Sequence, residues 1–186
     1  MKRYILIAGV NGAGKTTFYS TEEKFGDLIK INFDETVRSI GDWKNAADIK
    51  KAGLLVWKKI EECFERDLSF SQETTLCGQS ILKNIRRAKE SGYYIELYFV
   101  GVDSPETAKA RVKQRMSKGG HGISDEDIER RYSESLCNLK RVLPLCDLVT
   151  IFDNSIKLTK VSIFRQGECV WSAEKRPDWY RNLNLE

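Results

Sequence analysis

With 186 residues the chain is long enough to bury one full-sized core, and we expect a single domain over 1–186. Hydrophobic residues make up 41% and charged residues 31%, a balance that excludes a disordered or fibrous protein. The net charge is only +4, with acids interspersed among the bases, so no nucleic-acid partner is needed to explain it. The first apolar run, 4–8, is too short for a secretion signal or a membrane span, and the five cysteines contain no CxxC pair. We therefore expect a cytoplasmic protein with reduced thiols and no membrane partner.

Strands and helices are predicted to alternate along the chain. The apolar run at 4–8, a glycine-rich loop and a helix from Lys15 form the first strand–loop–helix unit. A second strand is predicted at 28–33, where apolar and polar residues alternate until Asp34. The same patterns predict later strands at 68–72, 94–100 and 148–152 and helices at 46–66, 81–91 and 128–143.

Two serines are predicted to begin helices in the second half of the chain. Ser104 precedes a proline and a basic stretch that ends at the Gly119–Gly122 break, and Ser124 precedes three acids. A β-hairpin is expected at about 158–173. We expect Trp171, Trp179 and Tyr180 to cover an edge of the core, and a contact surface is the alternative. Alternating strands and helices predict an α/β fold with a mainly parallel sheet flanked by helices, which binds ligands at the carboxyl ends of its strands.

Residues 9–16 read GVNGAGKT, a full match to the phosphate-binding pattern GxxxxGK[ST] between a predicted strand and a predicted helix. The fold class is therefore that of a P-loop NTPase, and the further residues described below make it kinase-like. The glycines let backbone N–H groups wrap the phosphates, Lys15 places a charge on the β- and γ-phosphates, and Thr16 offers a hydroxyl to Mg²⁺. ATP and Mg²⁺ are the predicted cofactors, and the loop residues predicted to bind them are Gly9, Asn11, Gly12, Ala13, Gly14, Lys15, Thr16 and Thr17.

Carboxylates follow two strands that are predicted to end at the same edge of the sheet. Asp34 could accept a proton from an attacking hydroxyl, although an Asp at this position is also typical of a cap for a helix that begins at Glu35. Glu73 could hold Mg²⁺ through water or bind substrate. Thr74 and Thr75 could hydrogen-bond a sugar or a phosphate.

A basic lid is predicted at about 109–131, on both sides of the glycine-rich break. Its arginines could close over a transferred phosphoryl group, and a solvated helix face is the alternative. The arginines are Arg111, Arg115, Arg130 and Arg131. We assign Arg115 and Arg131, with Lys15 and Asp34, to catalysis, and the other two arginines to substrate binding. His121, the one histidine of the chain, is predicted to bind phosphate or ribose.

Three further stretches accompany the loop and Asp34: the ETT triplet at 73–75, the run RVKQRMSKGGHGISDEDIERRYSESLCNL and the later IFDNS. With these motifs the sequence resembles the zeta-toxin family of P-loop kinases, especially its small predicted-ATPase branch, over about residues 3–156. The resemblance implies that ATP phosphorylates the 3′-hydroxyl of the amino sugar in UDP-N-acetylglucosamine. It also implies that Glu73 and Thr75 hold this sugar-nucleotide and that an antitoxin protein is a partner. The adenine end of ATP is implied to lie near Asp153, Asn154 and Ser155. The longer plasmid-type members differ in carrying a lid arginine near the position of His121.

Other classes of nucleotide-binding protein have signatures that this sequence does not contain. A GTPase switch would carry an NKxD motif and a transporter ATPase an LSGGQ motif, and neither occurs. Within the kinases, the residues do not separate sugar-nucleotide, other sugar, nucleoside and antibiotic acceptors. A nucleotide-binding ATPase or regulator without kinase activity is a further alternative.

Overall fold

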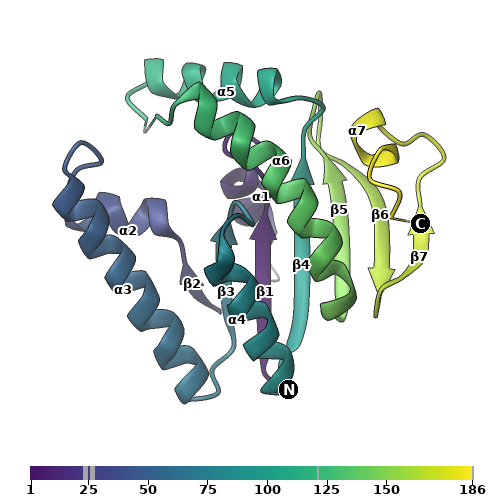
Figure 1. Ribbon diagram of the computed structural model, residues 1–186, viewed down its shortest axis with the longest axis horizontal. Helices are drawn as coiled ribbons and strands as arrows, with labels where there is room; N and C mark the ends of the chain where they lie inside the picture. The colour runs from purple at the N-terminus through teal and green to yellow at the C-terminus, as the bar shows by residue number, and fades with distance from the viewer. Residues whose placement is uncertain (23–24, 26–27, 121, 186) are drawn as a thin grey trace.

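In this computed structural model the described residues are 1–22, 25, 28–120 and 122–185. Strands and helices alternate along most of the chain (Figure 1). The strands are β1 (Arg3–Ala8), β2 (Ile29–Ile31), β3 (Phe70–Thr74), β4 (Tyr94–Gly101), β5 (Leu148–Asp153), β6 (Thr159–Arg165) and β7 (Glu168–Ser172). The helices are α1 (Lys15–Thr21), α2 (Phe33–Ile40), α3 (Ala46–Glu65), α4 (Gln79–Glu90), α5 (Pro105–Ser117), α6 (Asp125–Val142), the 3-10 turn η2 (Leu143–Leu145) and α7 (Asp178–Arg181).

The strands form one seven-stranded sheet in the order β2-β3-β1-β4-β5-β6-β7. Strands β1 to β5 pair in parallel, whereas β6 pairs antiparallel with β5 and β7 antiparallel with β6. The predicted α/β fold with a mainly parallel sheet and a C-terminal hairpin is therefore confirmed. Because β1 is the middle one of the five parallel strands, the loop that follows it lies at the centre of their carboxyl edge.

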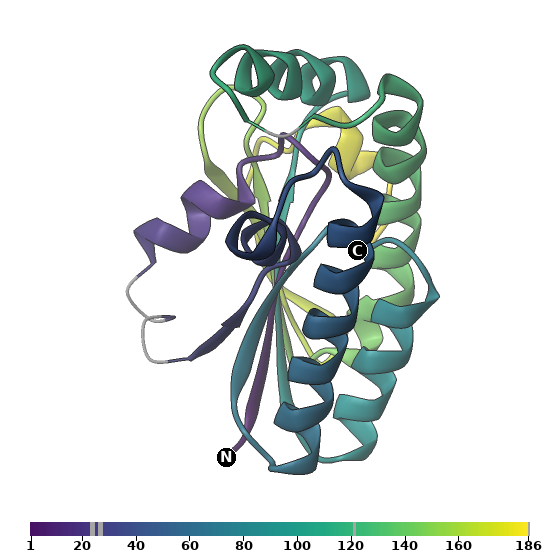
Figure 2. The same cartoon turned by 90° about the vertical axis from the view of Figure 1, so that its left-hand side faces the viewer.

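The sheet is covered on both faces, as Figure 2 shows, with α1 on one side and α3, α4 and α6 on the other. Side chains of β1 alternate between two buried clusters: Tyr4 and Leu6 pack with α3, α4 and α6, and Ile5 and Ile7 pack with α1 and α5. Both faces of this central strand are thus apolar, as expected for a buried parallel strand. Within the described residues, every helix is too short or too polar to cross a membrane.

Two strands, β2 and β3, have a boundary that differs from the prediction by more than one residue. The second strand ends at Ile31 instead of Phe33, because Asn32 caps α2 and Phe33 already belongs to that helix. The third strand begins at Phe70 instead of 68, because the N–H of Leu68 still bonds to the end of α3. Strand β3 then runs on to Thr74, since it pairs with β1 over that whole length.

The C-terminal residues complete the core at the far side of the sheet. Trp179 and Tyr180 are buried, and the Trp179 ring fills the space beside Gly101, where a Cβ would come within 2.3 Å of it. The expectation that these two aromatics cover the core is confirmed. It was wrong for Trp171, which is 45% exposed because it lies on the edge strand β7. All five cysteines are free, as predicted.

Candidate active site

The glycine-rich loop joins β1 to α1 and is held in place by its neighbours. Gly12 has φ +82°, and a Cβ there would come within 2.6 Å of the Ala108 carbonyl oxygen of α5. Gly14 has φ +96° and is the N-cap of α1, so the loop ends at a helix N-terminus. Side chains are excluded from both positions, and the loop can present its backbone N–H groups to an anion.

Lys15 is buried inside the curve of this loop, with 8% of its surface exposed. Its Nζ donates a hydrogen bond to the Val10 carbonyl at 3.2 Å and lies 3.9 Å from Oε1 of Glu73. Burial lowers the pKa of Lys15, and the negative charges of Glu73 and Asp34 oppose that effect. The site therefore contains a dehydrated cation that would gain from a phosphate group beside it.

Glu73, at the end of β3, receives contacts from α1 and from the cap of α2. Oγ1 of Thr16 donates to this carboxylate, at 3.0 and 3.1 Å from its two oxygens, and Nδ2 of Asn32 donates to Oε2 at 2.8 Å. The two residues predicted to bind Mg²⁺, Thr16 and Glu73, are thus in direct contact. A hydroxyl and a carboxylate are oxygen ligands of the kind Mg²⁺ prefers, so this pair fits the ion.

The ion would need further ligands from outside the protein. In the ranges 1–22, 25, 28–120 and 122–185, no group of three or more His, Cys, Asp and Glu side chains is placed to hold a metal. Mg²⁺ is commonly bound through one or two protein oxygens together with substrate phosphates and water. The arrangement suits an ion that arrives with a nucleotide.

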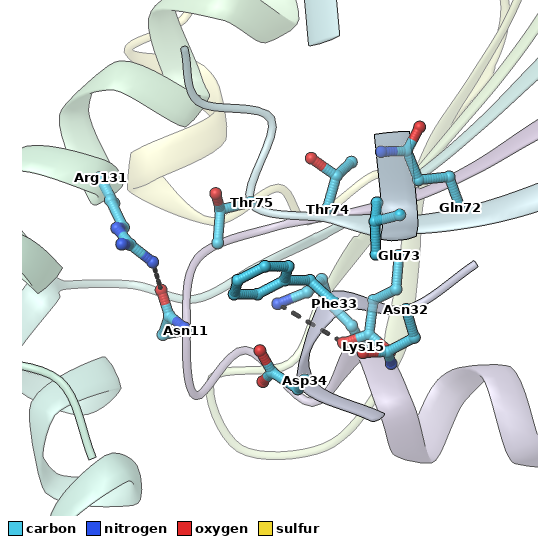
Figure 3. Close-up of a pocket in the computed structure, with 11 residues that line it drawn as sticks. Asn11, Lys15, Asn32, Phe33, Asp34, Gln72, Glu73, Thr74, Thr75 and Arg131 are labelled. Atoms are coloured by element: carbon cyan, nitrogen blue, oxygen red, sulfur yellow. Dashed lines mark hydrogen bonds and ion pairs between the residues drawn. The ribbon is translucent and has the colours of Figure 1, made fainter. Parts of the chain in front are cut away.

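Asp34 lies in the first turn of α2, and the cap of that helix is Asn32, whose Oδ1 accepts the N–H of Glu35 at 3.1 Å. The alternative that Asp34 caps a helix starting at Glu35 is therefore wrong. Figure 3 shows the Asp34 carboxylate beside Lys15, on the side of the cavity away from Thr74 and Thr75. A carboxylate in this place can accept a proton from a hydroxyl bound in the cavity.

Two cavities meet at this point. One, of about 220 Å³, is lined by the loop together with Arg111 and Arg115. The other, of about 270 Å³, lies between the start of α2, α3, the end of β3 and α6. Its lining also contains Asn32, Phe33, Val56, Gln72, Thr74, Thr75 and Arg131. Both cavities share the residues Asn11, Lys15, Asp34 and Glu73. The shared residues form the boundary between the two cavities, and the predicted phosphate site lies on the loop side of this boundary.

The predicted lid arginines do not all reach the cavities. Arg131 donates to Oδ1 of Asn11 at 3.2 Å, and Arg111 donates to the Ser155 carbonyl at 2.8 Å. Arg115 lines the phosphate cavity beside Arg111. Arg130 lines neither of the two cavities: it pairs with acids on its own helix, and its side chain is 58% exposed. The prediction for His121 lies outside the described residues.

Asn154 contacts the glycine-rich loop from outside. Its Nδ2 donates to the Ala13 carbonyl at 2.8 Å, and a Cβ on Gly14 would lie 2.5 Å from that nitrogen. The neighbouring Asp153 accepts a hydrogen bond from Nε1 of Trp179 at 2.9 Å. In this structure Asn154 thus acts on the loop backbone, whereas a contact with adenine stays a prediction.

The loop after β3 is fastened to α6. Leu76 has φ +61° and is buried, and its carbonyl accepts Nδ2 of Asn138 at 2.9 Å. Oε1 of Glu134 accepts the N–H of Gly78 at 2.7 Å, at the start of α4. The stretch ESLCN at 134–138, which follows the predicted lid, therefore supports the loop that carries Thr75.

Sequence reasoning missed several residues of the site. Asn32, Phe33, Val56 and Gln72 all line the second cavity. The signal for Asn32 was present, because Asn directly before an acid-rich helical turn is a typical N-cap. No comparable signal marks Val56 or Gln72, whose places depend on how α3 and β3 pack.

Comparison with known proteins identifies the family. The family model described as Zeta toxin matches residues 1–170. An uncharacterised protein of Haemophilus influenzae is 32% identical over 129 residues, which are 69% of this chain and 91% of that protein. The chain therefore belongs to the zeta toxin family, and the resemblance seen in the sequence motifs is confirmed. Family membership and the P-loop fold also confirm the prediction of an enzyme of the kinase class, a phosphotransferase.

Solved structures share the fold at low sequence identity. A chain of the AvrRxo1-ORF1:AvrRxo1-ORF2 complex with sulphate ions is 16% identical with a TM-score of 0.76, over 98% of this chain and 63% of that one. A chain of the PezAT chromosomal toxin–antitoxin system of Streptococcus pneumoniae is 17% identical with a TM-score of 0.61, over 98% of this chain and 76% of that one. The present chain thus spans less than two thirds of its AvrRxo1 neighbour, and at these identities the likeness shows the fold.

Proposed function

We propose that this zeta toxin family protein is an ATP-dependent kinase that phosphorylates a hydroxyl group of a small molecule. The observation that carries the proposal is the meeting of two cavities at Lys15, Asp34 and Glu73. A γ-phosphoryl group bound at this boundary would face its nucleotide on one side and an acceptor on the other. A regulator that only binds nucleotide would not need the second cavity.

The chain's own groups account for the transfer. Asp34 takes the proton of the acceptor hydroxyl, whose oxygen forms a bond to the γ-phosphorus while the bond from that phosphorus to the bridging oxygen breaks and ADP leaves. Lys15, together with Arg115 of α5 and Arg131 of α6, offsets the negative charge of the phosphates. Thr16 and Glu73 would hold Mg²⁺, which when bound supplies positive charge to the phosphate oxygens.

We further propose UDP-N-acetylglucosamine as the acceptor, on the basis of the family. The lining of the second cavity supports a sugar, because Gln72, Thr74 and Thr75 all offer groups that hydrogen-bond hydroxyls. Another sugar, a nucleoside or an antibiotic would use the same base and phosphate site. The acceptor is therefore a separate question from the reaction.

A protein partner is also proposed from the family. The PezAT neighbour is a chain of a toxin–antitoxin system, and the AvrRxo1 neighbour is a chain of the two-protein complex AvrRxo1-ORF1:AvrRxo1-ORF2. We infer that a small antitoxin protein binds this chain in the cytoplasm, where ATP is available. Purification of the tagged chain from its native cell tests this inference by the presence or absence of a stoichiometric small protein.

Phosphorus NMR with Mg-ATP and UDP-N-acetylglucosamine tests the reaction. We expect a new phosphomonoester signal, and Asp34→Asn should reduce its rate of appearance by roughly 10²-fold while ATP still binds. The matched control is Glu35→Gln, which removes the next carboxylate, an exposed partner of Lys30. Unchanged turnover in Asp34→Asn would remove Asp34 from its role as base. A signal that appears only with a different acceptor would refute UDP-N-acetylglucosamine as the acceptor, and the proposal of a kinase would stand.

A further inference from the structure

The side chain of Asn32 has no part in the chemistry described so far, although it lies inside the site. It is 6% exposed and sits where β2 ends and α2 begins. Its two polar atoms serve different elements: Oδ1 accepts the N–H of Glu35, and Nδ2 donates to Oε2 of Glu73. The partners fix this orientation of the amide, because a backbone N–H can only donate and a carboxylate can only accept.

The other two contacts of Glu73 have a second task once a nucleotide is bound. Thr16 donates its hydroxyl to Glu73 in this structure, but the same oxygen would turn its lone pairs to a cation. Lys15, 3.9 Å from Glu73, would turn to the phosphates. Asn32 has no such task, so its hydrogen bond can persist while the other two contacts change.

We propose that Asn32 is a positioning residue that holds the Glu73 carboxylate in place for the divalent cation. The same side chain fixes the first turn of α2, which carries Asp34. One buried amide thus sets the relative position of the cation-binding carboxylate and the base. This inference rests on the proposed function, in which Glu73 holds the cation.

Two substitutions of Asn32 separate its hydrogen bond to Glu73 from its role as the cap of α2. Asn32→Ser keeps a side chain that can cap α2, but its hydroxyl is one bond too short to cap the helix and reach Glu73 together. Asn32→Asp keeps the shape and the cap, and places an acceptor where the donor was. Asn45→Ser is the matched control, because Asn45 caps α3 in the same way, through Oδ1 and the N–H of Ala47, and is exposed.

The readout is the affinity for Mn²⁺, measured by electron paramagnetic resonance in the presence of a non-hydrolysable ATP analogue, together with the melting temperature. Asn32→Ser should bind Mn²⁺ about 10-fold more weakly, the usual scale for loss of a hydrogen bond that orients a metal-binding group. Asn32→Asp should bind Mn²⁺ at least as tightly as the unaltered protein, since it adds a negative charge beside the ion, and yet transfer phosphoryl groups more slowly. Asn45→Ser should leave the Mn²⁺ affinity unchanged.

Weaker Mn²⁺ binding in Asn32→Ser, together with unweakened Mn²⁺ binding in Asn32→Asp, supports a positioning role. Loss of a helix cap alone would not produce this pair of results. Mn²⁺ affinities in Asn32→Ser within twofold of the unaltered protein would overturn the proposal. If Asn32→Ser does not fold, an unchanged rate of phosphoryl transfer in Asn32→Asp would overturn it. Absence of Mn²⁺ binding by the unaltered protein with nucleotide is a different result, since it would refute the metal role of Glu73 in the proposed function.

Discussion

Replacing Lys15 by Met and Glu73 by Gln, singly and together, measures how strongly the two charges are coupled before a nucleotide binds. The side chains are 9% and 11% exposed, and Nζ lies 3.9 Å from Oε1. At an effective dielectric constant of about 20, Coulomb's law gives an attraction of about 4 kcal/mol at this distance. The dehydration of both ions offsets part of it, so we expect a coupling free energy of about 1–3 kcal/mol.

Urea unfolding of the four nucleotide-free proteins, followed by tryptophan fluorescence, gives this coupling. Each single variant leaves one buried charge without its partner, so the double variant should lose less stability than the sum of the two single losses. A coupling below about 0.5 kcal/mol would refute the reasoning, because the two charges would then be screened from each other. Glu73→Gln should also lower the pKa of Lys15 further, since the largest opposing charge is removed.

Two other predictions concern pH and the glycine-rich loop. Burial raises the pKa of the Cys146 thiol from 9.0 to about 12, so the stability it contributes is complete below pH 9 and is lost as the pH rises towards 12. The unfolding free energy of the unaltered protein minus that of Cys146→Ala should therefore fall by up to about 1.4 kcal/mol per pH unit above pH 9, and a constant difference in urea titrations would contradict this. Gly12→Ala should weaken ATP binding in calorimetry, because the new Cβ would meet the backbone of α5. Gly92→Ala is the matched control, because Gly92 has φ +73° but open space around it. The new Cβ would strain the backbone there without a steric clash, so ATP affinity should be unchanged.

Prediction from the sequence succeeded where a local motif implies a defined backbone structure. The glycine-rich loop could be placed because its match lies between a strand and a helix, and the caps Ser104 and Ser124 were found because each serine precedes a helical pattern. In the structure both serines accept the expected backbone N–H groups, from Thr107 and Asp127. Such signals are local and need no knowledge of packing.

Predictions failed or remained open where a neighbour in space decides the outcome. Arg130 and Arg131 are adjacent in sequence, but successive residues of a helix point about 100° apart, so only one of them faces the loop. Strand β3 was placed too early because its extent follows from pairing with β1. Asn32 and Gln72 join the site through contacts across the sheet, which periodicity does not reveal.

The hydrogen bond from Asn154 to the Ala13 carbonyl joins residues 141 positions apart. During synthesis on the ribosome the whole signature motif emerges early, but the amide that holds it appears only after most of the chain has been made. A nascent chain that ends before Asn154 thus carries the motif without this support, and it also lacks the strands that close the far side of the sheet. The predicted phosphate site is therefore among the last parts of the molecule to reach its final form, although it is encoded among the first.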